Sequence, residues 1–190
     1  ISVPSVLATL VSDKLDFPNL SMVGVDDRAA AYQAVSYLIQ QGHRKIAVLG
    51  GPATSHPSMM RRQGAQQAME DAGIRFEDKL YGLSNYDFES AYHAMNGLLA
   101  RRAEFTALFA MSDVIAFGAI RALVSAGLRV PEDVSVIGFD GITMSRYCVP
   151  VMTTIVQPSE QIALQSIELL VRQIEHGAPA QTITLQPELQ

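Results

Sequence analysis

Carboxylates stand at the ends of several apolar runs in this sequence, where they could support binding or acid–base chemistry. Asp26, Asp113 and Asp140 all fall at such positions. The clearest example is VSVIGFD, residues 134–140, in which a run that resembles a buried parallel strand ends in Asp140. In open α/β sheets ligands bind outside the carboxyl ends of the strands, so we expect Asp140 in a recognition site. The alternative is an Asx turn or a helix cap.

A catalytic interpretation of these carboxylates needs a defined pair. Two of them could in principle act as a glycosidase pair, but spacing along the chain does not fix their separation. The sequence offers no nucleophile elbow and no metal-ligand spacing, and Gly50-Gly51 lacks the GK[ST] ending of a phosphate-binding loop. Because no complete catalytic set is present, we predict that this chain is not an enzyme.

The elements that position these carboxylates follow a regular alternation. Apolar strand-like runs alternate with helical segments, which predicts a parallel sheet covered by helices on both faces. The predicted strands cover residues 22–25, 46–49, 80–83, 107–110 and 134–139. The predicted helices cover residues 26–41, 58–72, 87–101 and 113–125, and several end at a glycine. These roughly five βα repeats predict one self-sufficient lobe.

The two ends of the chain do not complete a second lobe of this kind. Residues 1–11 contain one apolar stretch, and residues 154–190 contain a strand, a helix over 159–175 and a strand over 183–185. We therefore expect residues 1–24 to be the remnant of an N-terminal lobe, 25–153 the C-terminal lobe, and 154–190 the crossover and return. A portion before residue 1, with half of a ligand cleft, is expected to be absent.

Composition restricts the class of protein further. The 190 residues are 48% hydrophobic and 17% charged, which is typical of a globular domain. A net charge of −5 argues against this segment gripping nucleic acid by itself. With one cysteine, Cys148, and no Cys/His cluster, the sequence predicts neither a metal nor a cofactor and favours a reducing compartment. No membrane-length apolar run or secretory signal is visible, so we expect a cytoplasmic protein without membrane contact.

Four segments of the sequence resemble the effector-binding domain of lactose/galactose-type (LacI/GalR) repressors. They are GHRKIAVLGGP at 42–52, SDVIAFGAIRAL at 112–123, GLRVPEDVSVIGFD at 127–140 and TTIVQP at 153–158. The resemblance covers essentially the whole chain, with the motifs in the family's order and spacing. It implies an α/β, periplasmic-binding-protein-like fold with doubly wound parallel sheets in two lobes. The C-terminal lobe would be complete and the N-terminal lobe only partly present.

The resemblance also implies the partners. In the family an effector binds in the cleft between the lobes, the domain forms a homodimer, and an N-terminal helix-turn-helix binds operator DNA. No segment of this chain resembles that helix-turn-helix. Effector binding would change lobe closure and with it the spacing of the DNA-binding heads. The alternative is a periplasmic sugar-binding protein of a transport system, which would share the fold. The quoted motifs favour a repressor.

Arg61 occupies the position at which the family places an arginine that clamps the effector. Its planar fork can donate two parallel hydrogen bonds to vicinal hydroxyls or to a carboxylate, and it could pair with Asp140 across the cleft. The alternative is a solvated helix arginine. Ser112 stands where the family often carries an asparagine, which removes a bidentate amide. Asp113 either contacts ligand or caps the following helix.

The remaining expected contacts also rest on the resemblance or on loop position. Tyr86 would lie against the effector ring or simply pack beneath a loop. Gln157 would reach the ligand from the crossover or cap a strand end. Ser55 and His56 follow Gly50-Gly51, within reach of a ligand, although loop histidines are usually solvated. Such a polar cleft suits a sugar, with a nucleoside or purine as the alternative.

Two further residues fall near the family's dimer contacts. Phe117 lies on one face of a predicted helix, and Cys148 precedes the VPVMTT segment. The alternative for both is burial in the core of the monomer.

Overall fold

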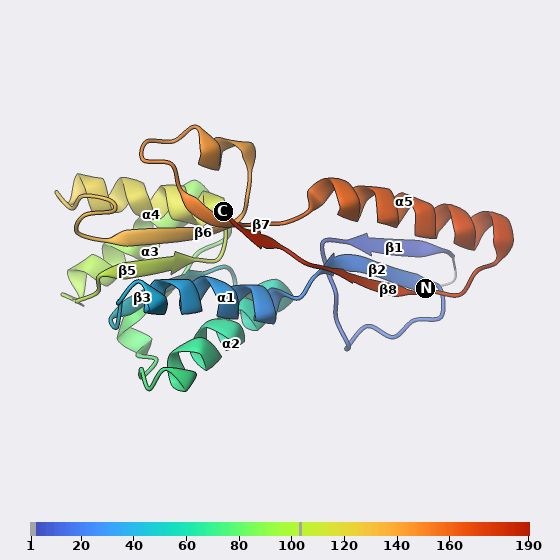
Figure 1. Ribbon diagram of the computed structural model, residues 1–190, viewed down its shortest axis with the longest axis horizontal. Helices are drawn as coiled ribbons and strands as arrows, with labels where there is room; N and C mark the ends of the chain where they lie inside the picture. The colour runs from blue at the N-terminus through green and yellow to red at the C-terminus, as the bar shows by residue number, and fades with distance from the viewer. Residues whose placement is uncertain (1–2, 103) are drawn as a thin grey trace. The chain divides into compact units, whose positions relative to one another are not determined.

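The computed structural model describes residues 3–102 and 104–190 and divides the chain into two compact units (Figure 1). Unit 1 comprises Ile1–Asp26 and Gln157–Glu188, and unit 2 comprises Asp27–Val156 and Leu189–Gln190. The apolar stretch expected over residues 1–11 includes residues 1 and 2, which lie outside the described residues. Parallel sheets in two units confirm the predicted fold class.

Unit 1 contains a three-stranded parallel sheet and one long helix. The strands are β1 (Ser5–Ala8), β2 (Leu20–Val25) and β8 (Thr182–Leu185), in the order β1-β2-β8. Helix α5 (Ser159–His176) packs along β1 and β2. Its buried side chains Ile162 and Leu169 meet Val23 of β2 in a small core. Apolar residues on the rest of α5 are exposed, so the helix is apolar on more than its packed face.

Unit 2 contains a six-stranded sheet in the order β4-β3-β5-β6-β7-β9. Its strands are β3 (Ile46–Gly50), β4 (Tyr81–Leu83), β5 (Ala107–Ala110), β6 (Ser135–Asp140), β7 (Thr153–Val156) and the short β9 (Glu188–Leu189). Strands β3 to β7 pair in parallel. β3 and β5 are buried along their whole length, as the continuous apolar runs of a doubly covered parallel sheet require.

Helices cover both faces of this sheet (Figure 1). Helices α1 (Asp27–Gln40) and α2 (His56–Asp71) pack together on one face, and α3 (Phe88–Ala100) and α4 (Asp113–Ser125) pack together on the other. Two 3-10 turns, η1 (Asp78–Leu80) and η2 (Thr143–Arg146), lie in the connections. Helix α2 begins two residues earlier than predicted, because Pro57 fits the first helical turn, where a missing N–H costs little.

Glycines bring each helix pair into close contact. A Cβ on Gly64 of α2 would lie 2.0 Å from the carbonyl oxygen of Arg28 in α1. A Cβ on Gly118 of α4 would lie 2.4 Å from the carbonyl oxygen of Phe88 in α3. Real Cβ atoms do not approach backbone this closely, so both contacts depend on glycine. Gly64 therefore fixes the position of α2, the helix that carries Arg61.

Within the described parts of the chain, no helix is long and apolar enough to cross a membrane.

Candidate functional site

The carboxyl ends of the parallel strands of unit 2 bring most of the predicted ligand contacts to one edge. Ser55 and His56 follow β3, Tyr86 follows β4, Ser112 follows β5 and Asp140 ends β6. Gln157 directly follows β7 but belongs to unit 1, where it is half-buried. Parallel strands end at a common edge, so the sequence order of these residues becomes a spatial cluster.

Arg61 is buried at this edge and held from several sides. Its side chain projects from α2 and is only 6% exposed. Its Nε donates to Oδ1 of Asp27 at 2.7 Å, and its Nη1 donates to the carbonyl oxygen of Met111. The guanidinium carbon lies 3.6 Å from the centroid of the Phe139 ring. Stacking and two directed hydrogen bonds fix the plane of the guanidinium, as a preorganised donor requires.

Asp27 is a functional candidate that the sequence interpretation missed. It is the first residue of α1, is 4% exposed, and forms the buried ion pair with Arg61. The predicted helix starts at Asp26, and the sequence does not show which of the adjacent carboxylates, Asp26 or Asp27, faces the interior. The sequence did contain a signal for this ion pair: Asp26 and Asp27 directly follow the apolar LSMVGV run. A buried arginine needs a charged partner, so one of these two carboxylates could have been expected to pair with Arg61.

Asp140 lies beside Arg61 in an unusual backbone conformation. Its Oδ1 is 3.6 Å from Nη1 of Arg61, and its side chain is 29% exposed. Its φ is 113°, a value that L residues rarely adopt. Strained residues of this kind cluster at binding sites, because the surrounding fold must over-determine them. The structure thus brings Arg61 and Asp140 together within unit 2.

Ser112 and Asp113 have different structural roles. The Ser112 hydroxyl accepts a hydrogen bond from the Ile115 backbone N–H at 3.1 Å, so Ser112, and not Asp113, is the N-cap of α4. The fully buried Asp113 accepts from Oγ1 of Thr154 at 2.6 Å and from the Ile142 N–H at 2.8 Å. Burial raises the pKa of the Asp113 carboxyl, and the hydrogen bond from Thr154 opposes that shift. Asp113 therefore ties β7 and the segment that follows β6 to α4.

Tyr86 packs over the glycine turn that follows β3. A Cβ on Gly51 would lie 2.1 Å from the Tyr86 ring, so only glycine admits the ring there. Tyr86 has a φ of 61°, and its hydroxyl is buried without a hydrogen-bond partner among the described residues. Ser55 precedes α2 and makes no side-chain cap, and His56 is the half-buried first residue of that helix. An aromatic face and an unsatisfied hydroxyl suit a polar ring ligand.

Comparisons with known proteins place the chain in a family. Residues 35–190 match the family described as periplasmic binding protein-like domain. The whole chain is 37% identical to the HTH-type transcriptional regulator MalR of Clostridium butyricum and covers 57% of that protein. The fold matches a sugar-binding transcriptional regulator of the LacI family from Escherichia coli, complexed with phosphate, with a TM-score of 0.81, 31% identity, and coverage of 90% of this chain and 66% of that one. This chain belongs to the LacI family.

A second solved transcriptional regulator is also similar to this chain. The transcriptional regulator CelR in its complex with cellobiose matches with a TM-score of 0.87 and 34% identity, over 93% of this chain and 55% of that one. The LacI-family chain spans about half the length of the curated relatives it matches. These relatives are transcriptional regulators, which confirms the prediction that the domain is not an enzyme.

The predicted dimer contacts of this LacI-family domain lie on two elements of unit 2. Phe117 is half-buried on α4. Cys148 is half-buried after η2, and its thiol donates to the carbonyl oxygen of Ser145. Its neighbours Tyr147, Val149 and Val151 are exposed. The dimer interface stays a prediction.

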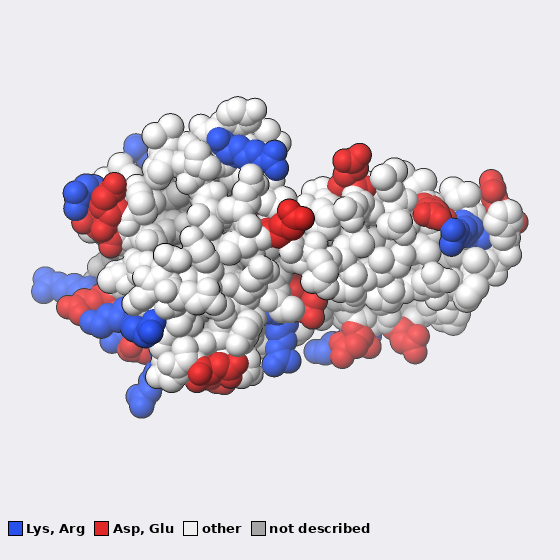
Figure 2. Space-filling model, viewed as in Figure 1, with Lys and Arg blue, Asp and Glu red and all other residues white. Residues whose placement is uncertain are grey.

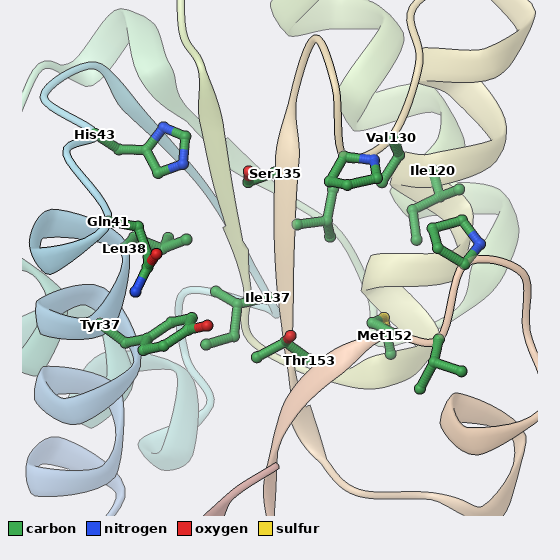
Figure 3. Close-up of a pocket in the computed structure, with 14 residues that line it drawn as sticks. Tyr37, Leu38, Gln41, His43, Ile120, Val130, Ser135, Ile137, Met152 and Thr153 are labelled. Atoms are coloured by element: carbon green, nitrogen blue, oxygen red, sulfur yellow. The ribbon is translucent and has the colours of Figure 1, made fainter.

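A separate groove of about 410 Å³ lies near the amino ends of β6 and β7 (Figure 3). Tyr37 of α1, with Gln41 and His43 after that helix, lines one side, and Ile120 of α4 lines the other. Its lining carries no carboxylate or guanidinium. Because ligands of such sheets bind at the carboxyl ends of the strands, the edge with Arg61 and Asp140 remains the better candidate site. Among the described residues, no three His, Cys, Asp or Glu side chains gather where they could hold a metal ion.

Proposed function

We propose that this domain binds a small polar effector, a sugar or sugar derivative, at the carboxyl edge of the six-stranded sheet of unit 2. The observation that carries the proposal is the buried guanidinium of Arg61, fixed by Asp27 and Phe139 with Asp140 at 3.6 Å. Such a pair offers donors and an acceptor to adjacent ligand hydroxyls. The complex of CelR with cellobiose supports a sugar as the ligand class.

We further propose that the complete protein is a cytoplasmic, homodimeric regulator of transcription, and that it binds operator DNA through a helix-turn-helix outside this chain. The relatives named as HTH-type regulators support this role over a transport receptor. Effector binding would act by favouring one conformational state of the dimer, to the extent that it binds the two states with different affinity.

The proposal is tested by calorimetric titration of the 190-residue chain with glucose, maltose, cellobiose and cytidine. We expect at least one sugar to bind, and we expect Arg61→Lys to weaken binding by about tenfold or more, because lysine cannot form the planar fork. Lysine keeps a charge beside Asp27, whereas Arg61→Ala would remove the cation from the buried Asp27 carboxylate and would destabilise the fold. Arg75→Lys, on an exposed arginine after α2, is the matched control. A folded chain that binds no sugar would contradict the proposal.

A further inference from the structure

Arg61 and its two ion-pair partners carry a net negative charge on unit 2. Arg61 supplies one positive charge, and the Asp27 carboxylate compensates it at 2.7 Å. Asp140 adds a second carboxylate at 3.6 Å from the same guanidinium. The buried Asp113 uses its oxygens for Thr154 and Ile142, and burial favours its neutral form. A ligand at this edge therefore meets a guanidinium that is already neutralised, with an extra carboxylate beside it.

The neighbouring cation does not change this balance. Arg62 stacks over Tyr81, with its guanidinium carbon 4.5 Å from the ring centroid, and lies 5.5 Å from the centroid of Phe76. Its Nη2 is 3.7 Å from the carboxylate of Asp78. Arg62 therefore interacts with two aromatic rings and an aspartate that are not part of the Arg61 cluster. His56, the first residue of α2, carries a charge only when protonated.

The helix N-termini at this edge offer limited compensation. A helix N-terminus attracts anions through its free N–H groups. At α4 the Ser112 hydroxyl already accepts from the Ile115 N–H, and Asp113 occupies the first turn. At α2 the first turn contains Pro57, which has no N–H to donate.

We infer that this edge selects an uncharged, hydroxyl-rich ligand and rejects its phosphorylated or carboxylated counterpart, with Asp140 as the specificity-determining residue. The inference rests on the proposed function and narrows its ligand class. A phosphate within a few ångströms of Asp140 is repelled, whereas a neutral hydroxyl donates a hydrogen bond to the same carboxylate. Discrimination between neutral and phosphorylated ligands is relevant to this fold, because the LacI-family regulator of Escherichia coli named above is complexed with phosphate.

The test compares matched ligand pairs by calorimetric titration of the 190-residue chain: glucose, maltose and cellobiose, each with its 6-phosphate. For the sugar that binds, we expect the neutral form to bind at least about tenfold more tightly than the phosphate, and we expect this ratio to shrink as salt is raised. Asp140→Asn should reduce the ratio by about tenfold, because it removes the repelling charge and keeps an acceptor. Asparagine tolerates positive φ, so the fold should be retained.

Glu132→Gln is the control, since it makes the same change in net charge at an exposed residue before β6. We expect it to leave the ratio unchanged. A phosphorylated sugar that binds more tightly than its neutral form to the parent chain overturns the inference and leaves the proposed function standing. An unchanged ratio in Asp140→Asn also overturns it. Binding of neither form of any sugar overturns the proposed function and the inference with it.

Discussion

At the scale of single residues, the site is defined by conformations that cost stability. Asp140 at the end of β6 has a φ of 113°, and Tyr86 beyond β4 has a φ of 61°. A fold optimised only for stability would place glycine at such positions. Both residues instead carry side chains that lie at the carboxyl edge of the sheet. Under the proposed function, this strain would be the cost of presenting a carboxylate and an aromatic ring to a ligand.

The strain at Asp140 predicts that a glycine substitution is more stable than an alanine substitution, the reverse of the usual order. Asp140→Gly and Asp140→Ala both remove the carboxylate, but only glycine adopts the observed φ freely. We expect the glycine variant to be more stable than the alanine variant by about 1 kcal/mol in urea unfolding, although alanine is normally the more stabilising residue. Both should lose ligand affinity. An alanine variant that matched or exceeded the glycine variant would show that the residue is not strained.

At the scale of secondary-structure elements, the position of Arg61 depends on how α2 packs. Gly64 lies three residues after Arg61 in α2. At Gly64 the helix packs against α1, facing the carbonyl oxygen of Arg28. Asp27, the partner of Arg61, begins α1. The same helix–helix contact therefore fixes both members of the buried ion pair.

Gly64→Ala should separate the two helices and disturb the ion pair. Its Cβ would lie 2.0 Å from backbone, so we expect a loss of about 1–3 kcal/mol in unfolding free energy and weaker ligand binding. Gly97→Ala, in the interior of α3, is the matched control, because nothing lies within 4 Å of its Cβ position. That variant should gain about 0.5–1 kcal/mol, since alanine favours helix. Equal effects of the two substitutions in thermal and urea unfolding would refute the packing argument.

At the scale of the whole molecule, the charged and apolar side chains of the surface bear on the proposed contacts with DNA and with a second chain. Lys and Arg are interspersed with Asp and Glu, and no extended basic face appears in this view (Figure 2). This surface agrees with the net charge of −5 and supports the proposal that DNA is bound by another part of the protein. Apolar side chains are instead exposed after η2, where Val149 is 97% exposed between Tyr147 and Val151. Exposed apolar clusters of this kind mark association surfaces.

The proposed dimer predicts that Val149→Asp weakens self-association. A carboxylate at this exposed position would be desolvated in an interface, so we expect the dimer dissociation constant to rise by about tenfold or more. Sedimentation or light scattering over a concentration series measures this constant. Val3→Asp makes the same change at an exposed valine of unit 1, before β1; it is the control and should leave the constant unchanged. If Val149→Asp dimerised like the parent chain, the interface would lie elsewhere.

The pattern of the sequence was sufficient for the order and type of the helices and strands from α1 to β7 in unit 2, whereas β9 was not predicted. The predicted spans 107–110 and 113–125 coincide with β5 and α4, because a short buried run and a capped periodic segment each carry their signal locally. The position of Asp140 at the end of β6 was predictable for the same reason. The predicted starts of α2 and β4 were wrong by one or two residues. Helix α2 begins earlier because Pro57 fits its first turn, and β4 begins later because η1 precedes it.

The partners of each site residue were decided by tertiary structure. Asp27 pairs with Arg61 across 34 positions of sequence, and Asp113 receives its hydrogen bonds from Thr154 and Ile142. Sequence chemistry identifies which groups can ionise or donate, because that is a property of the residue type. Which carboxylate lies close to the arginine depends on distances between elements that only packing sets. The sequence thus determined the fold class and the edge at which we propose that a ligand binds, and the tertiary structure decided which charges surround Arg61 at that edge.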